Sequence, residues 1–122
     1  MTTTAASRQA MGRYGEGVAE RHLVEQGLVV LDRNWHGDAG EVDLVLRDGD
    51  TLVICEVKTR YDDAYGTPHE AITPAKLARL KRLAGEWIHE RGVLPPATRI
   101  DLVAVQRPRR GPARVEHVRG LG

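Results

Sequence analysis

Aromatic side chains are scarce in this sequence. They make up 4% of its 122 residues, and phenylalanine is absent. Any hydrophobic core must therefore consist mainly of Val, Leu, Ile and Ala. Hydrophobic residues as a whole reach 41%, which is an ordinary fraction for a globular protein. The composition argues against a disordered chain and predicts one domain with a modest aliphatic core.

Cysteine occurs once, so no disulfide bond can form within the chain. Cys55 lies in an apolar stretch, and we expect it to be buried and inert rather than nucleophilic. Long hydrophobic runs are also lacking, because none approaches the roughly 20 residues of a membrane-spanning helix. Residues 1–10 contain no signal-peptide core. These absences predict a cytoplasmic protein without a membrane partner.

Neither clustered histidines nor an excess of one charge sign is present. The five histidines are scattered, and no Ser-His-Asp set is apparent, which disfavours zinc and serine hydrolases. The net charge is only +1, but residues 1–57 carry a net −5 and residues 58–122 a net +6. An acidic half beside a basic half suits a metal-dependent enzyme that acts on a polyanion. Chance segregation of the charges is the alternative.

The most informative stretch is residues 40–60, GEVDLVLRDGDTLVICEVKTR. It predicts two strands of alternating character that are joined by a turn at Asp48 and Gly49. Such a turn places Asp43 opposite Ile54, and it makes Asp43 and Glu56 diagonal neighbours about 7–8 Å apart. Glu41 would then lie opposite Glu56. One face of the first strand is expected to carry three apolar residues: Val42, Leu44 and Leu46.

Two carboxylates at this separation can hold one cation between them. Like charges repel on a partly dry strand face, and a divalent ion would remove that repulsion. Hard oxygen ligands suit Mg²⁺ or Mn²⁺. The alternative is a solvent-facing side of the hairpin, on which Glu56 pairs with Lys58 or with a neighbouring arginine.

The segments around the hairpin predict further elements. Residues 1–7 are expected to form a flexible lead, and apolar spacing predicts a helix over residues 8–26. A short strand should follow at 28–31. Residues 59–72 should form a loop that is long enough to be functional.

The second half of the chain predicts a helix and a strand. Thr73 is a suitable N-cap and Pro74 a suitable first helical residue for a helix that runs to Glu90. A strand over 99–105 should then pair in parallel with the second hairpin strand through a right-handed crossover. Basic residues crowd the first half of this helix, where they oppose its dipole and favour an external anion, unless they form a solvated face: Lys76, Arg79, Lys81 and Arg82.

The order helix, three strands, helix, strand, with Asp43 ahead of Glu56, Val57 and Lys58, resembles the PD-(D/E)xK nuclease superfamily. Val42 stands where the superfamily's name has proline. More closely, the chain resembles the YraN family of small bacterial endonucleases, which are likened to archaeal Holliday-junction resolvases. The match covers roughly residues 12–105 and is carried by Gly15, Glu16, Asn34, Trp35, Gly40, Glu41, Val42, Asp43, Glu56, Val57, Lys58, Thr59, Arg60, Gly66, Pro68, Glu70, Ala71 and Lys76.

The resemblance implies an α/β, restriction-endonuclease-like fold of three layers, with a mixed central sheet flanked by helices. The nuclease-like domain would cover residues 8–106. A tail rich in Arg, Pro and Gly would follow at 107–122, with a short edge strand suggested at 114–118.

The resemblance also implies roles for particular residues. Asp43 and Glu56 would bind Mg²⁺ or Mn²⁺, with the carbonyl of Val57 as a further ligand and Glu16 approaching from the first helix. Lys58 would orient the attacking water and stabilise the transition state. Arg60, Lys76 and Arg79 would hold flanking phosphates, while the role of Glu41 stays ambiguous.

The implied activity is metal-dependent endonucleolytic hydrolysis of phosphodiester bonds in DNA, with branched or structured DNA as one substrate. Resolving a junction would require two active sites and hence a homodimer. The alternative is a non-catalytic nucleic-acid-binding or adaptor protein that retains the nuclease fold.

Overall fold

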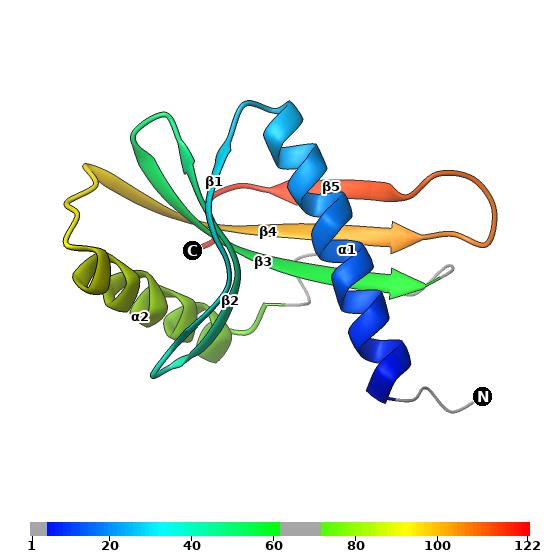
Figure 1. Cartoon of the computed structure of the whole chain (residues 1–122), viewed down its shortest axis with the longest axis horizontal. Helices are drawn as coiled ribbons and strands as arrows, with labels where there is room; N and C mark the ends of the chain where they lie inside the picture. Colours follow the sequence, from blue (N-terminus) through cyan, green and yellow to red (C-terminus); the bar gives the residue numbers. More distant parts are fainter. Residues whose placement is uncertain (1–4, 62–71) are drawn as a thin grey trace.

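The computed structural model describes residues 5–61 and 72–122. Within these residues, three strands follow the first of two helices and two strands follow the second (Figure 1). Their order is α1 (Ala5–Glu25), β1 (Val29–Gly37), β2 (Gly40–Asp48), β3 (Thr51–Tyr61), α2 (Pro74–Arg91), β4 (Ala97–Arg107) and β5 (Arg114–Val118).

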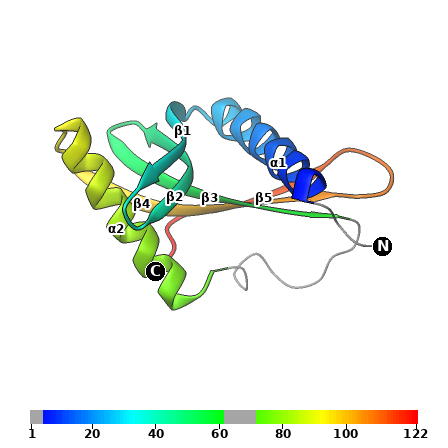
Figure 2. The same cartoon turned by 60° about the horizontal axis from the view of Figure 1, so that its bottom comes forward.

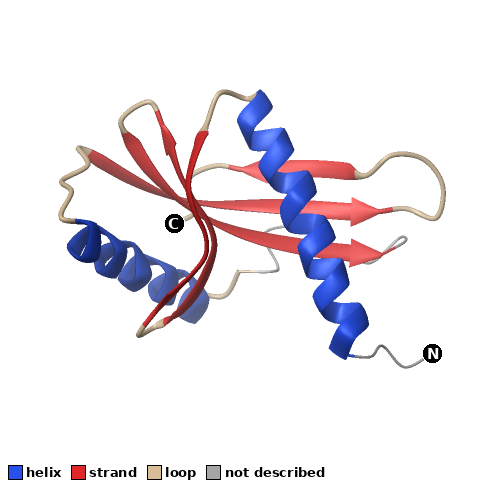
Figure 3. Cartoon of the chain, in the orientation of Figure 1, coloured by secondary structure: helices blue, strands red, loops and turns tan. Residues whose placement is uncertain are grey.

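The strands form one mixed sheet in the order β1-β2-β3-β4-β5. β3 and β4 are parallel, as predicted for a crossover through α2, and the other neighbours are antiparallel. The two helices cover opposite faces of the sheet (Figures 2 and 3). One aliphatic cluster lies under α1 and a second lies under α2. The predicted α/β fold class, with a mixed sheet flanked by helices, is confirmed.

The ends of α2 follow the sequence signals. Thr73 is the N-cap, and its hydroxyl accepts a hydrogen bond from the Lys76 amide, while Pro74 is the first helical residue. Gly92 ends the helix in the left-handed conformation. Neither helix of the described chain has the length and hydropathy that a membrane span requires.

Several boundaries differ from the prediction. α1 begins at Ala5 rather than at residue 8. β1 extends to Gly37 because it pairs with β2 along most of its length. β3 continues through Tyr61, so only part of the predicted loop over residues 59–72 can be a loop. The rest, with Gly66, Pro68, Glu70 and Ala71, lies outside the described residues.

The predicted hairpin register was wrong by two residues. Asp48 pairs with Thr51 and Val45 pairs with Ile54, so the turn consists of Gly49 and Asp50. Gly49 has φ +62°. A glycine at the first central position is typical of a type II′ turn, whose twist suits a hairpin. The turn therefore moves one position along the chain, and Asp43 does not lie opposite Ile54.

The common face expected for Val42, Leu44 and Leu46 was also wrong. Leu44 and Leu46 pack in the cluster under α1, whereas Val42 packs in the cluster under α2. The pairing of β2 with β3 reaches only as far as Leu44 and Cys55, while β2 stays paired with β1 beyond that point. The hairpin of β1 and β2 thus bends away from β3 at Asp43 (Figure 1), and the two strands form a fork there.

Candidate active site

The fork between β2 and β3 brings two of the predicted carboxylates together. Leu44 and Cys55 are the last paired residues of β2 and β3, and Asp43 and Glu56 are the next residue on each strand. Continuing the same register places Asp43 directly opposite Glu56, not diagonal to it. The Val57 amide donates a hydrogen bond of 2.7 Å to Asp43 Oδ2. Through this bond the backbone of β3 fixes the carboxylate of β2 across the fork.

The electrostatic environment of Asp43 is unfavourable for its charge. Burial, together with the neighbouring Glu56 and Glu16, raises the pKa of this carboxyl from 3.8 to about 7, although the Val57 hydrogen bond acts in the opposite direction. Asp43 therefore retains a proton to a higher pH than an exposed aspartate does. A buried carboxylate with two acidic neighbours is stabilised by any cation that reaches it.

Glu16 reaches the fork from α1. Its Oε1 accepts a hydrogen bond from the side-chain amide of Asn34 in β1. Asn34 adopts a left-handed conformation, φ +46°, which asparagine tolerates better than most residues. Glu16 and Asp43 line a common cavity of about 210 Å³. Asn34 thus acquires a positioning role that the sequence did not assign to it.

α1 can approach the sheet closely because Gly15 faces Thr59 of β3. A Cβ atom at Gly15 would lie 1.6 Å from Thr59 Oγ1. We expect Gly15→Ala to lower the free energy of unfolding by about 1–3 kcal/mol through overpacking. Gly17→Ala is the matched control, since its Cβ would lie 3.7 Å from the Arg21 side chain. It should stabilise α1 by up to about 1 kcal/mol. Urea unfolding measures both changes, and equal effects would contradict a close contact specific to Gly15.

Lys76 contacts the site directly. Its Nζ lies 3.6 Å from Glu56 Oε2, and both side chains are largely buried. The first turn of α2 therefore neutralises part of the acidic charge. Arg79, one turn later, packs beside Gly40, and its Nε is buried without a hydrogen-bond partner among the described atoms. The phosphate contacts predicted for Lys76 and Arg79 stay predictions.

The other predicted residues lie around the fork. Lys58 is exposed on β3, two residues after Glu56, and Arg60 is partly buried two residues further on. Glu41 is exposed and pairs in register with His36, away from Glu56. Within residues 5–61 and 72–122, no three His, Cys, Asp or Glu side chains are grouped closely enough to hold a metal ion. The fork thus offers a pair of acids, Asp43 and Glu56, with Glu16 close by.

This donor set fits a hard divalent cation. Asp43 and Glu56 are carboxylates, which Mg²⁺ and Mn²⁺ prefer, and the charges of Glu56 and Glu16 disfavour the ionised form of Asp43. A softer metal is not favoured, because Cys55 is fully buried in the cluster under α1 and burial raises the pKa of its thiol. The expectation of an inert cysteine is consistent with both observations.

Sequence analysis missed the contacts that hold the β1–β2 hairpin on α2. Glu86 accepts hydrogen bonds from the amides of Asp38 and Ala39 in the hairpin turn, at 2.6 and 3.1 Å. The Trp35 indole donates to Glu90 at 2.9 Å. These bonds keep the hairpin bent toward α2 and so maintain the fork. No local pattern could have indicated them, because the partners are about 50 residues apart.

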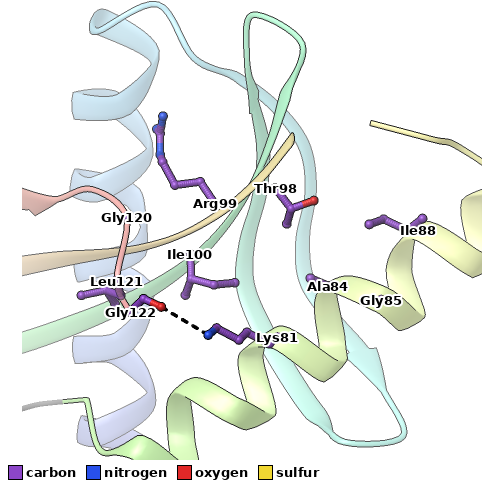
Figure 4. A pocket seen from close by; sticks show the side chains of 10 residues that line it. All are labelled: Lys81, Ala84, Gly85, Ile88, Thr98, Arg99, Ile100, Gly120, Leu121 and Gly122. Atoms are coloured by element: carbon purple, nitrogen blue, oxygen red, sulfur yellow. Dashed lines mark hydrogen bonds between the residues drawn. The ribbon is translucent and has the colours of Figure 1, made fainter. Parts of the chain in front are cut away.

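A larger cavity of about 560 Å³ lies between α2 and β4 (Figure 4). Lys81 reaches across it and donates a hydrogen bond of 3.3 Å to the Gly122 carbonyl. The residues that line this cavity include no carboxylate. It therefore does not supply the acidic chemistry of the fork.

Comparisons with known proteins identify relatives over the whole chain. The model of "Uncharacterised protein family UPF0102" matches residues 15–105, which include Glu16, Asp43 and Glu56. A UPF0102 protein of a Nocardioides species is 61% identical over the full length of both chains. A UPF0102 protein of Kineococcus radiotolerans is 58% identical over 94% of this chain and 95% of its own. One of Beutenbergia cavernae is 55% identical over 95% of this chain and 98% of its own.

Proposed function

Since the chain belongs to the UPF0102 family, which is the YraN family that the sequence resembles, we propose that it is a metal-dependent endonuclease acting on DNA. The observation that supports this proposal is the partly buried pair of Asp43 and Glu56 in the fork. The raised pKa of Asp43 marks a site that is short of positive charge. A structural carboxylate pair would be expected to have its charge balanced by the protein itself.

In the proposed reaction, Asp43 and Glu56 hold Mg²⁺ or Mn²⁺ through their carboxylate oxygens, with Glu16 and the Val57 carbonyl as further candidate ligands. Such an ion supplies positive charge at the scissile phosphate and lowers the pKa of an attacking water. The Val57 amide orients Asp43, and Asn34 orients Glu16.

Lys58 has a different task. As an exposed ammonium group on the same strand as Glu56, it aligns the water and stabilises the negative charge that grows on the phosphate.

One observation favours a non-catalytic nucleic-acid-binding protein as the second candidate. Lys76 already pairs with Glu56, so the acidic charge of the fork is partly compensated without an ion. Under this alternative the acids are structural, and the basic residues 58–122 bind DNA without cleaving it.

A cleavage assay distinguishes the two functions. Single-stranded, duplex, flapped and branched DNA are incubated with Mg²⁺, Mn²⁺ or EDTA. We expect metal-dependent cleavage by the parent protein, and Glu56→Gln should reduce its rate by about 10²-fold or more. Glu25→Gln, an exposed substitution at the end of α1, is the matched control and should keep the parent rate. The nuclease proposal fails if no substrate is cut, or if both variants cleave equally well.

A further inference from the structure

Two tyrosines and an arginine meet where β3 and β4 end. The Arg107 guanidinium lies 4.8 Å from the ring centroid of Tyr14 and 5.9 Å from that of Tyr61. Tyr61 and Arg107 are register partners in the parallel pair, whereas Tyr14 comes from α1. Three separate elements thus hold this group in place. We call it the tyrosine platform: Tyr14, Tyr61 and Arg107.

Tyr14 is partly buried against the cluster under α1, but burial does not explain the placement of Tyr61. Tyr61 is 50% exposed, and Arg107 is exposed as well. The two tryptophans, by contrast, pack under α2 and donate hydrogen bonds to acidic side chains. The chain has three tyrosines and no phenylalanine, and two of those tyrosines belong to the platform. The Tyr61 ring thus contacts Arg107 and is half exposed.

The connection between β4 and β5 beside the platform is basic, whereas Asp62 and Asp63 follow Tyr61 directly in the sequence. Residues 107–114, RPRRGPAR, connect β4 to β5 and carry four arginines and no acid. This connection lies at the same end of the molecule as the end of β3 and the first turns of α1 (Figures 1 and 2). Arg13, the neighbour of Tyr14, is exposed and lines the cavity that contains Asp43 and Glu16. A polyanion at the fork would therefore also be attracted to the platform.

We propose that the tyrosine platform stacks an unpaired base of a single-stranded DNA segment that adjoins the cleavage site. The assignment of the fork as the cleavage site rests on the proposed function, whereas the stacking itself does not. Aromatic rings beside a positively charged groove are the usual means of binding single strands, because every base has a π-face. In an uninterrupted duplex both faces of a base are covered by its neighbours, so only an unpaired base can stack on Tyr61.

The distance along β3 limits where the unpaired base lies. Tyr61 is three residues beyond Lys58 and five beyond Glu56, which corresponds to about 10 and 17 Å along an extended strand. Because both separations are odd, Tyr61 lies on the α1 face of β3, whereas Glu56 lies on the face toward α2. The bound DNA would have to pass the edge of β3 that β2 leaves beyond Cys55, so these distances are lower bounds. At a rise of about 3.4 Å per nucleotide, these lower bounds correspond to roughly three to five nucleotides. The proposed substrate is thus DNA whose unpaired base lies a few nucleotides or more from the scissile bond, as in a flap or a branch.

Binding measurements without a divalent ion test the platform independently of cleavage. Fluorescence anisotropy in EDTA would compare a labelled dT12 single strand with a 12-base-pair duplex. We expect Tyr61→Ala to weaken binding of dT12 by about 10-fold or more and to leave duplex binding unchanged within about twofold. Tyr61→Trp, which keeps a flat aromatic face, should bind dT12 as well as the parent does. Leu94→Ala is the control, because Leu94 is a 95% exposed apolar residue just before the start of β4, whereas Arg107 of the platform ends that strand.

Salt dependence separates stacking from charge. Tyr61→Ala should leave the slope of log K against log salt unchanged, whereas Arg110→Ala should reduce it by about 0.7. The platform is refuted if the parent does not bind dT12, if Tyr61→Ala binds dT12 as the parent does, or if it weakens duplex and single strand equally. Selective loss of dT12 binding in a protein that cleaves nothing would support the platform and refute the nuclease proposal.

Discussion

Asp43→Asn is expected to stabilise the metal-free protein at pH 8 while it abolishes DNA cleavage. The pKa of Asp43 rises from 3.8 to about 7 on folding, so the folded state favours the protonated carboxyl. The stabilisation linked to this proton is fully present below pH 3.8 and is lost as the pH rises through about 7. Above that pH the ionised carboxylate costs roughly 4 kcal/mol at most, at 1.36 kcal/mol per pH unit. Asparagine cannot ionise, yet it can still accept the Val57 hydrogen bond.

Urea unfolding in EDTA at pH 5 and pH 8 measures this effect. From pH 5 to pH 8, ionisation of Asp43 should lower the free energy of unfolding of the parent by about 2–3 kcal/mol relative to that of Asp43→Asn. Glu25→Gln, the exposed control, should follow the parent at both values. If the parent and Asp43→Asn lose the same stability between pH 5 and pH 8, Asp43 does not have the raised pKa.

Added Mn²⁺ should reverse the order of stability. At an ion concentration 100-fold above Kd, the parent should gain about 2.7 kcal/mol, and Asp43→Asn should gain nothing measurable. Because the ion must displace the proton of Asp43, its apparent affinity should fall about tenfold per pH unit below 7. Cleavage by the variant should drop by about 10³-fold or more, since the ligand is lost together with its charge. Equal stabilisation of both proteins by Mn²⁺ would place the ion elsewhere.

The pairing of Asp43 with Glu56 was predictable although the turn was placed incorrectly. Side chains alternate with a period of two, so a register error of two residues does not by itself move a side chain to the other face of the sheet. The error moved Asp43 from a diagonal position to the position opposite Glu56, and the prediction of two neighbouring carboxylates survived. The helix caps were predictable for a similar reason, because Thr73, Pro74 and Gly92 act within one turn of the chain.

The features that make the fork a candidate site depend on contacts distant in sequence. Strand alternation assigned Val42 and Leu44 to one face, since no local pattern shows that β2 leaves β3 at Asp43. The bend is maintained by Glu86 and Glu90 on α2, and neither carries a motif. The burial that raises the pKa of Asp43 is likewise a property of the packed helices. The two neighbouring acids were therefore predictable from the sequence, whereas their environment was not.

Lys58→Ala should reduce single-turnover cleavage by about 10²-fold or more, the magnitude seen when one preorganised donor to the transition state is lost. Lys58 is exposed and lies two residues after Glu56 on β3, where it can interact with the negative charge that develops on the phosphate. Substrate affinity should change by less than about threefold, because one phosphate contact among several contributes modestly. Removing a cation near the carboxylates should leave Mn²⁺ affinity unchanged or tighten it.

Lys76→Ala is the variant to compare with Lys58→Ala. Lys76 forms an ion pair with Glu56, whereas no such pair with Lys58 is found among the described residues. Loss of Lys76 should tighten Mn²⁺ binding more than loss of Lys58, since its ammonium group competes with the ion for Glu56 at 3.6 Å. Its effect on cleavage at saturating Mn²⁺ should be smaller than that of Lys58→Ala.

A binding protein predicts a different outcome: neither variant changes a metal-dependent rate, and each loses DNA affinity in step with its lost charge. Cleavage, DNA affinity and Mn²⁺ affinity measured on the same two variants therefore separate a lysine that acts on the transition state from one that only neutralises an acid.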